Sequence, residues 1–225
     1  MGERILLLGG TREAIALARE LVAAGHDVTT SLAGRTREPR PVEGEMRIGS
    51  FGGIEGLIDY LHEAGTERIV DATHPFATTM SANAVEACRA VGLPLERHER
   101  PPWSHVDGDT WIEAVDVEAA AAILPSGSRA LLALGSQHIE PFTTRPDVFF
   151  LVRMIDPPDR PLPLASCEVV AARPSSDWKD EARLLRDHRI DHVVSRNSGG
   201  CGAYAKIEAA RALGLPIIMI ARPRL

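Results

Sequence analysis

The chain has 225 residues, 44% of them hydrophobic and 25% charged, which is enough for one large α/β domain or two small ones with buried cores. Its formal net charge of −6 argues against a nucleic-acid partner. Its apolar runs reach only five or six residues, as at 217–221 and 119–124, so no segment is expected to span a membrane, which needs roughly 20.

The cysteines indicate a reducing compartment. Cys88, Cys167 and Cys201 are scattered and include no Cys-x-x-Cys pair, which also argues against a structural zinc site. The eight histidines show no metal-ligand spacing, so no metal is expected. An apolar strand begins within four residues of Met1, which leaves no room for a secretory signal. We therefore expect a cytoplasmic protein.

Strand and helix patterns alternate along the chain. In the N-terminal half, strands are predicted at residues 4–8, 27–32, 46–48, 68–71 and 93–97, with helices at 13–24, 54–64 and 78–91. After a break at residues 101–103, helices are predicted at 115–124, 177–187 and 203–213, with strands at 129–134, 148–153, 167–171, 191–195 and 216–220. This alternation predicts parallel sheets covered by helices on both faces.

An internal repeat suggests how these elements are grouped. The string EACRAVGLPL at Glu86–Leu95 is echoed 122 positions later by EAARALGLPI at Glu208–Ile217. Either a Rossmann-like unit is duplicated, or helix–Gly–Leu–Pro–strand corners simply recur in α/β proteins. We favour the first, which predicts an α/β fold of two Rossmann-like parallel-sheet domains, residues 1–103 and 104–225. The active site is then expected in the cleft between them.

The first strand runs directly into a Gly9-Gly10 turn and a helix. Two glycines allow a tight turn and a close approach of the backbone to a ligand, and the helix N-terminus attracts phosphate. Reading from Gly9, however, Thr11 and Ala14 occupy the second and third glycine positions of the dinucleotide fingerprint. The turn therefore indicates a phosphate site, with a plain strand–turn–helix corner as the alternative.

The end of the second strand bears on the choice of nucleotide. An NAD site is expected to carry Asp or Glu there, for the ribose 2′-hydroxyl. This chain has Ser31, followed by Arg35 and Thr36, and a hydroxyl with a guanidinium suits a 2′-phosphate. These residues fit NADP(H) better than NAD(H). The alternative is that Arg35 is only a solvated surface charge.

Two further strand ends carry candidate residues. In Asp71-Ala72-Thr73-His74-Pro75, Asp71 and Thr73 could orient the His74 imidazole, and a structural histidine is the alternative. In the C-terminal half, the string Asn197-Ser198-Gly199-Gly200 precedes a helix and forms a second anion-ready turn. Lys206, inside that helix, either reaches the cleft or is solvated.

Taken in order, these motifs resemble one known family. The strings LGGTREA at 8–14, SLAGRT at 31–36, GSFGGIEGL at 49–57, DATHPFA at 71–77, RPPW at 100–103 and NSGG at 197–200 are similar to those of the precorrin-6A reductase family of cobalamin biosynthesis. The resemblance covers nearly the whole chain, and DATHPFA is its most specific part. Arg173-Pro174-Ser175-Ser176 and Arg196 depart from the family pattern.

The resemblance implies an NADPH-dependent reductase that converts precorrin-6A, an acidic tetrapyrrole, to precorrin-6B. It implies that NADPH is bound by Gly9, Gly10, Thr11, Ser31, Arg35, Thr36, Gly52 and Gly53. Thr73 and His74 would face the reacting centre, and the substrate would be bound by Asn197, Ser198, Gly199 and Lys206. The alternatives are a cobalt-precorrin-6A reductase of the anaerobic branch and a non-catalytic NADP(H)- or tetrapyrrole-binding protein.

Overall fold

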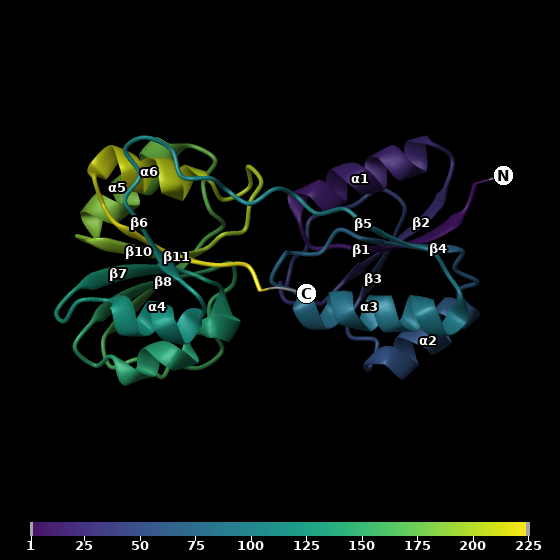
Figure 1. The fold of residues 1–225 in the computed structure, drawn as a ribbon, viewed down its shortest axis with the longest axis horizontal. Helices are drawn as coiled ribbons and strands as arrows, with labels where there is room; N and C mark the ends of the chain where they lie inside the picture. The colour runs from purple at the N-terminus through teal and green to yellow at the C-terminus, as the bar shows by residue number, and fades with distance from the viewer. Residues whose placement is uncertain (1, 224–225) are drawn as a thin grey trace. The chain divides into compact units, whose positions relative to one another are not determined.

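The computed structural model describes residues 2–223, which form two compact units (Figure 1). One unit extends to Arg100 and the other comprises Pro101–Pro223. The end of the predicted second domain, 224–225, lies outside the described residues. Trp103, placed by the sequence at the end of the first domain, packs in the core of the second unit.

The first unit contains one parallel sheet. Within the described residues its strands are β1 (Arg4–Leu8), β2 (Asp27–Leu32), β3 (Glu45–Ile48), β4 (Arg68–Asp71) and β5 (Leu95–Arg97), in the order β3-β2-β1-β4-β5. Its helices are α1 (Arg12–Ala23), α2 (Ile54–Glu63) and α3 (Thr78–Val91). The central strand β1 pairs with β2 on one side and β4 on the other, both in parallel.

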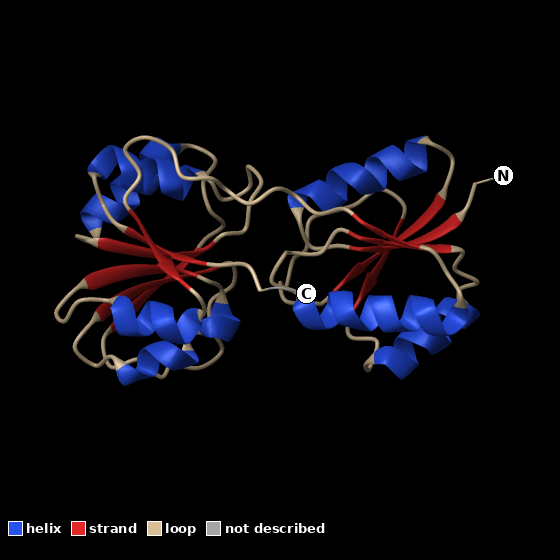
Figure 2. Ribbon diagram, viewed as in Figure 1, coloured by secondary structure: helices blue, strands red, loops and turns tan. Residues whose placement is uncertain are grey.

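Strand β1 is buried on both faces because helices cover both. Alternate side chains of a strand point to opposite faces. Ile5 and Leu7 accordingly pack in the cluster that includes α1, whereas Leu6 and Leu8 pack in the cluster formed with α2 and α3. Figure 2 shows α1 on one side of this sheet and α2 and α3 on the other. This explains the unbroken apolar run at the start of the chain.

The second unit also contains a parallel sheet. Its described strands are β6 (Trp111–Ala114), β7 (Arg129–Ala133), β8 (Phe149–Met154), β9 (Cys167–Ala171), β10 (His192–Arg196) and β11 (Ile217–Ile220), in the order β6-β11-β10-β7-β8-β9. Its helices are α4 (Val117–Ile123), α5 (Trp178–Asp187) and α6 (Ala205–Leu213), with two 3-10 turns, η1 (Ser136–His138) and η2 (Glu140–Thr144).

The two sheets share one strand order, apart from the added edge strand β6. Strands β9-β8-β7-β10-β11 take the places of β3-β2-β1-β4-β5, so β7 corresponds to β1 and β10 to β4. The repeated strings Glu86–Leu95 and Glu208–Ile217 then fall at equivalent corners, α3 to β5 and α6 to β11. One difference matters for function: β1 leads into the long helix α1, whereas β7 leads only into the short turns η1 and η2.

Three elements of the second unit differ from those predicted. Strand β6 was not expected, because it is short and lies at the sheet edge against β11, with little of its surface buried. The helix expected from residue 115 begins at Val117, because the Asp116 side chain caps it by accepting a hydrogen bond from the Ala119 N–H at 2.7 Å. Helix α6 likewise begins at Ala205 rather than at residue 203.

Candidate active site

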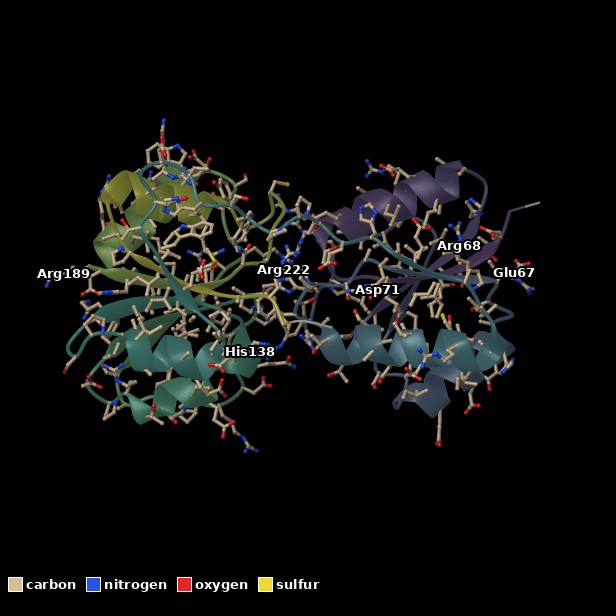
Figure 3. All side chains as sticks on the ribbon, in the orientation of Figure 1. Glu67, Arg68, Asp71, His138, Arg189 and Arg222 are labelled. Atoms are coloured by element: carbon tan, nitrogen blue, oxygen red, sulfur yellow. The ribbon has the colours of Figure 1, made fainter. Side chains whose placement is uncertain are left out.

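The carboxyl ends of β1 and β4 form the reversal point of the first sheet. The chain leaves β1 toward β2 on one side and leaves β4 toward β5 on the other. In open parallel sheets, ligands bind beyond the strand ends at this point. The Gly9-Gly10 turn and the segment after Asp71 both lie there. The topology thus brings together two motifs that are more than 60 residues apart in the sequence (Figure 3, Asp71).

The Gly9-Gly10 turn lies close to β2 and is open above Gly10. The Gly9 N–H donates to the Ser31 carbonyl at 3.0 Å, and a Cβ at Gly9 would lie 2.8 Å from the Thr30 Cγ2. Gly10 has φ 107°, and no described atom lies within 4 Å of where its Cβ would stand. A ligand therefore has room to approach the backbone just before α1 begins.

Thr11 fixes the start of α1 and joins it to the end of β4. Its Oγ1 accepts from the Ala14 N–H at 3.0 Å and donates to the Ala72 carbonyl at 3.0 Å. The side chain is buried, so the hydroxyl serves as a helix cap. Thr11 thereby aligns the N-terminus of α1, with its positive dipole end, on the reversal point.

Ser31 is held by an arginine that the sequence analysis did not single out. Arg47, on the neighbouring strand β3, donates to the Ser31 Oγ at 3.3 Å and to the carbonyls of Gly49 and Ser50, both at 2.8 Å. Its guanidinium also stacks on the Phe51 ring at 3.7 Å from the centroid. Arg47 therefore orders the turn that contains Gly52 and Gly53. The register of β2 and β3, which pairs Ser31 with Arg47, was the information needed to find it.

The other predicted cofactor residues lie on the loops that follow β2 and β3. Arg35 is exposed and Thr36 half-buried in the loop after β2. Gly52 and Gly53 have φ values of 85° and 97°, and Gly53 caps α2. These loops belong to strands on the β1 side of the reversal point.

Asp71 organises the segment after β4. Its carboxylate accepts from the Thr73 N–H at 3.1 Å, from the Thr73 Oγ1 at 2.7 Å and from the Ser81 Oγ at 2.5 Å. The Arg97 Nε lies 3.8 Å away. The Asp71 side chain is 2% exposed, so these partners replace water around a buried charge. The Thr73 hydroxyl is thus directed toward Asp71 and anchors the segment to α3.

His74 lies half-buried on this segment, with a defined ring orientation. Its Nδ1 accepts from the Phe76 N–H at 3.2 Å, and its ring centroid is 5.7 Å from that of Phe76. Because Nδ1 acts as an acceptor, the neutral ring carries its proton on Nε2. The Phe76 N–H therefore helps to orient the imidazole, beside whatever Asp71 and Thr73 contribute through the backbone that they hold.

Replacing Asp71 with Asn should lower the free energy of unfolding by about 1–3 kcal/mol, because the amide cannot accept all the hydrogen bonds that converge on the carboxylate. Urea unfolding with a matched Asp59→Asn control, at an exposed position on α2, measures the difference. Equal stability of the two variants would show that Asp71 does not hold the segment.

In the second unit, the predicted substrate residues hold the segment around Trp103. The Asn197 Oδ1 accepts from the Trp103 N–H at 2.8 Å, and its Nδ2 donates to the Trp103 carbonyl at 3.0 Å. Gly199 is buried with φ 67°, and a Cβ there would clash with the Pro101 carbonyl. Arg222 (Figure 3) donates to the carbonyls of Asn197 and Ser198 at 2.9 and 3.1 Å. The side chain of Asn197 is therefore engaged within the fold.

Lys206 is neither solvated nor on an open surface. It is 3% exposed, its Nζ donates to the Ala203 carbonyl at 2.8 Å, and it lies 4.8 Å from the centroid of the Trp103 ring. Burial, with repulsion from Arg153, lowers its pKa to about 7, against the opposing attraction of Glu181. Arg153 and Glu181 form a buried ion pair of 2.7 Å. Sequence reasoning missed this pair, because only tertiary packing brings β8 to α5.

Among the described residues, no group of three or more His, Cys, Asp or Glu side chains could hold a metal ion. None of the helices within residues 2–223 has the length and apolar character needed to cross a membrane.

The whole chain is similar to proteins of one family. Residues 4–225 match the family model described as precorrin-6x reductase CbiJ/CobK. The precorrin-6A reductase of Rhodobacter capsulatus is 48% identical over 98% of this chain and 88% of its own length. The cobalt-precorrin-6A reductase of Priestia megaterium is 31% identical over 98% of this chain and 91% of its own. A solved structure titled CobK precorrin-6A reductase has a TM-score of 0.96 and 47% identity, over 100% of this chain and 90% of that one.

Proposed function

The chain belongs to the precorrin-6x reductase CbiJ/CobK family, and from this premise we propose that it uses NADPH to reduce one carbon–carbon double bond of metal-free precorrin-6A, giving precorrin-6B in cobalamin biosynthesis. Members of the family are oxidoreductases. The observation that carries the proposal is the meeting of the Gly9-Gly10 turn and the Asp71–His74 segment at the reversal point between β1 and β4.

The geometry of the first unit fits a dinucleotide. Gly10 leaves open space over the backbone, and Thr11 aims the N-terminus of α1 at that space. The second unit lacks this arrangement, because the 3-10 turns η1 and η2 replace a long helix after β7. We therefore assign the cofactor to the first unit, with Gly9, Gly10, Ser31, Arg35, Thr36, Gly52 and Gly53 contributing and Thr11 acting through the helix that it caps. NADPH, when bound, supplies the hydride.

The residues of the chain bind and orient the reactants. Asp71 fixes Thr73 and with it the backbone that carries His74. His74 carries its proton on Nε2 in the neutral ring, since Nδ1 accepts from the Phe76 N–H, and we assign the imidazole to the donation or positioning of the proton that accompanies reduction. Asn197, Ser198 and Gly199 are assigned to the substrate side, where they would shape the turn that meets the acidic tetrapyrrole. The N–H groups of Asn197 and Ser198 already donate within the fold, to the carbonyls of Ile220 and Arg196 at 2.9 and 2.7 Å. Lys206 would act on it only through the buried cluster that it shares with Arg153.

The metal-free substrate is favoured over the cobalt-bound one. Identity is 48% to the Rhodobacter precorrin-6A reductase and 31% to the Priestia cobalt-precorrin-6A reductase, over similar shares of this chain.

The three cysteines are free thiols in the structure, which agrees with a reducing cytoplasm as the proposed compartment.

Replacing His74 with Ala should lower kcat by at least about tenfold if the imidazole participates in proton transfer, since general acids contribute roughly 10²–10⁴. His62→Ala, an exposed histidine on α2, is the matched control. Turnover of the His74 variant within a few-fold of the parent would remove the acid role and leave the proton to solvent.

The proposed function is tested by an anaerobic assay that follows oxidation of NADPH and NADH with metal-free and with cobalt-bound precorrin-6A. Consumption of NADPH with the metal-free substrate, and formation of precorrin-6B by mass spectrometry, is the expected result. Turnover only with the cobalt-bound ring would show that the enzyme belongs to the anaerobic branch of the pathway. A change in NADPH fluorescence without turnover on either substrate would indicate a binding protein.

A further inference from the structure

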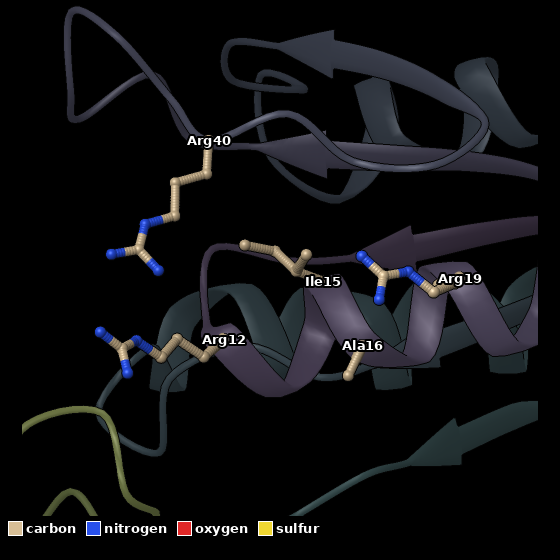
Figure 4. A pocket seen from close by; sticks show the side chains of 5 residues that line it. All are labelled: Arg12, Ile15, Ala16, Arg19 and Arg40. Carbon is tan, nitrogen blue, oxygen red and sulfur yellow. The ribbon is translucent and has the colours of Figure 1, made fainter. Parts of the chain in front are cut away.

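One flank of α1 carries an open hollow lined by three arginines and two aliphatic side chains. Its volume is about 400 Å³, and its lining is Arg12, Ile15, Ala16, Arg19 and Arg40 (Figure 4). We call it the arginine hollow. Arg12, Ile15, Ala16 and Arg19 share one face of α1, because residues three, four and seven apart lie together on a helix. Arg40 comes from the connection between β2 and β3.

The connection that carries Arg40 is held against α1. Val42 packs in the same cluster as Leu17 and Leu21 of the helix, which fixes the backbone two residues from Arg40. In Figure 4 the guanidinium groups of Arg12 and Arg40 extend to the same end of the hollow, beside the first turn of α1, with Ile15 between Arg40 and Arg19. Two side chains from separate segments thus converge on one place.

The charges of the arginine hollow are not neutralised within residues 2–223. Neither Arg12 nor Arg40 has a carboxylate within salt-bridge distance there, and the same holds for Arg19. Several other arginines of this unit pair with carboxylates, as in Arg68 with Glu3 at 2.8 Å and Arg100 with Glu13 at 2.6 Å. The Arg100 pair also occupies the one carboxylate in the first turn of α1. Three cations around one concave surface favour a dianion.

The position of the hollow points to the nature of that dianion. Arg12 is the first residue of α1 and follows directly on the turn proposed for the cofactor, while Arg40 lies beyond the end of β2. In a Rossmann unit the end of β2 is where the ribose 2′ position is distinguished. The Ser31 hydroxyl already accepts from Arg47, and Arg35 does not line the hollow.

We infer that Arg12 and Arg40, supported by Arg19, bind the 2′-phosphate of the cofactor and determine the preference for NADPH over NADH. This rests on the proposed function and replaces Arg35 by Arg40 as the main 2′-phosphate ligand. A phosphate monoester carries about −1.5 to −2 charge at pH 7 and accepts bidentate hydrogen bonds from guanidinium groups. A free phosphate ion has the same chemistry, so the test separates the two sources.

The test compares 2′,5′-ADP with 5′-AMP, which differ only in the 2′-phosphate, by titration calorimetry on the full chain. The parent should bind 2′,5′-ADP at least about tenfold more tightly than 5′-AMP, and Arg40→Gln or Arg12→Gln should each reduce that ratio about tenfold. In the same variants, kcat/KM for NADPH divided by kcat/KM for NADH should also fall. Arg89→Gln, which removes an exposed positive charge on α3, should leave both ratios unchanged.

The remaining outcomes are distinguishable. Equal binding of 2′,5′-ADP and 5′-AMP by the parent would overturn the NADPH preference in the proposed function itself. If the parent prefers 2′,5′-ADP and this preference survives in Arg12→Gln, Arg40→Gln and the double variant, the inference is overturned but the proposed function is not. If the preference is lost in Arg35→Gln instead, Arg35 is the ligand of the 2′-phosphate. Inorganic phosphate and 5′-AMP can each be tested as competitors of 2′,5′-ADP. If inorganic phosphate competes as strongly as 5′-AMP, the hollow is a site for free anions, and the inference is overturned.

Discussion

Replacing Glu181 with Gln is expected to lower the free energy of unfolding by about 3–5 kcal/mol, the cost of breaking a buried ion pair from one side. Glu181 accepts from Arg153 at 2.7 Å and from the Ser175 N–H at 2.9 Å, and both charged side chains are at most 6% exposed. Lys206 and Arg196 add further positive charge to the same region. Loss of the carboxylate leaves buried cations without their counter-charge.

Urea unfolding measures this cost, with Asp180→Asn as the matched control. Asp180 is the preceding residue on α5, but its pair with Arg183 is exposed, so its loss should change the free energy by less than about 1 kcal/mol. The double variant Arg153→Met with Glu181→Leu should recover much of the loss, because an apolar pair needs no desolvated charge. A Glu181→Gln variant as stable as the control would contradict the electrostatic account of this cluster.

Replacing Lys206 with Met is expected to stabilise the protein, and to do so more at low pH than at high pH. The pKa of Lys206 is about 7 in the folded chain, against an ordinary value of 10.5, mainly because burial disfavours the charged form. Between these two values the unfolded chain binds the additional proton, so the stability of the parent rises with pH across this window. The penalty is complete below about pH 7 and vanishes near pH 10.5.

The free energy of unfolding at pH 6.5 and 8.5 tests this dependence. The advantage of Lys206→Met over the parent should be larger at the lower pH by an amount on the order of 2 kcal/mol, at about 1.4 kcal/mol for each unit of pKa difference. Lys179→Met is the control, because Lys179 is exposed on α5 and is the only other lysine of the chain. An advantage that does not change with pH would show that Lys206 stays charged in the folded protein.

These two predictions concern a part of the molecule that sequence reasoning interpreted incompletely. Lys206 follows the Asn197–Gly200 string and was assigned to the substrate side or to solvent. The structure buries it between Trp103 and the Arg153–Glu181 pair. Nothing local marks Arg153 or Glu181, because the first lies in a strand and the second in a strongly amphipathic helix where a charged residue is usually exposed.

In the first unit, too, some features of the proposed cofactor site could be predicted from the sequence and others could not. The Gly9-Gly10 turn and the helix after it were recognisable because the requirement for glycine and the helix signal are local. Arg47 was not, because its contact with Ser31 follows from the register of β2 and β3. Arg12 and Arg40 are 28 positions apart, and only the packing of Val42 against α1 brings their segments together.

From local patterns alone, the chain could be assigned to the α/β class, to two Rossmann-like units and to one family. Buried parallel strands, helix caps and glycine turns each leave a signature within a few residues, and the repeat of Glu86–Leu95 at Glu208–Ile217 reflects one strand order used twice. The edge strand β6, the partners of Asp71 and the burial of Lys206 emerged only in the folded chain. Each depends on which distant backbone comes alongside, and pairing and desolvation between distant segments leave no periodicity in the sequence.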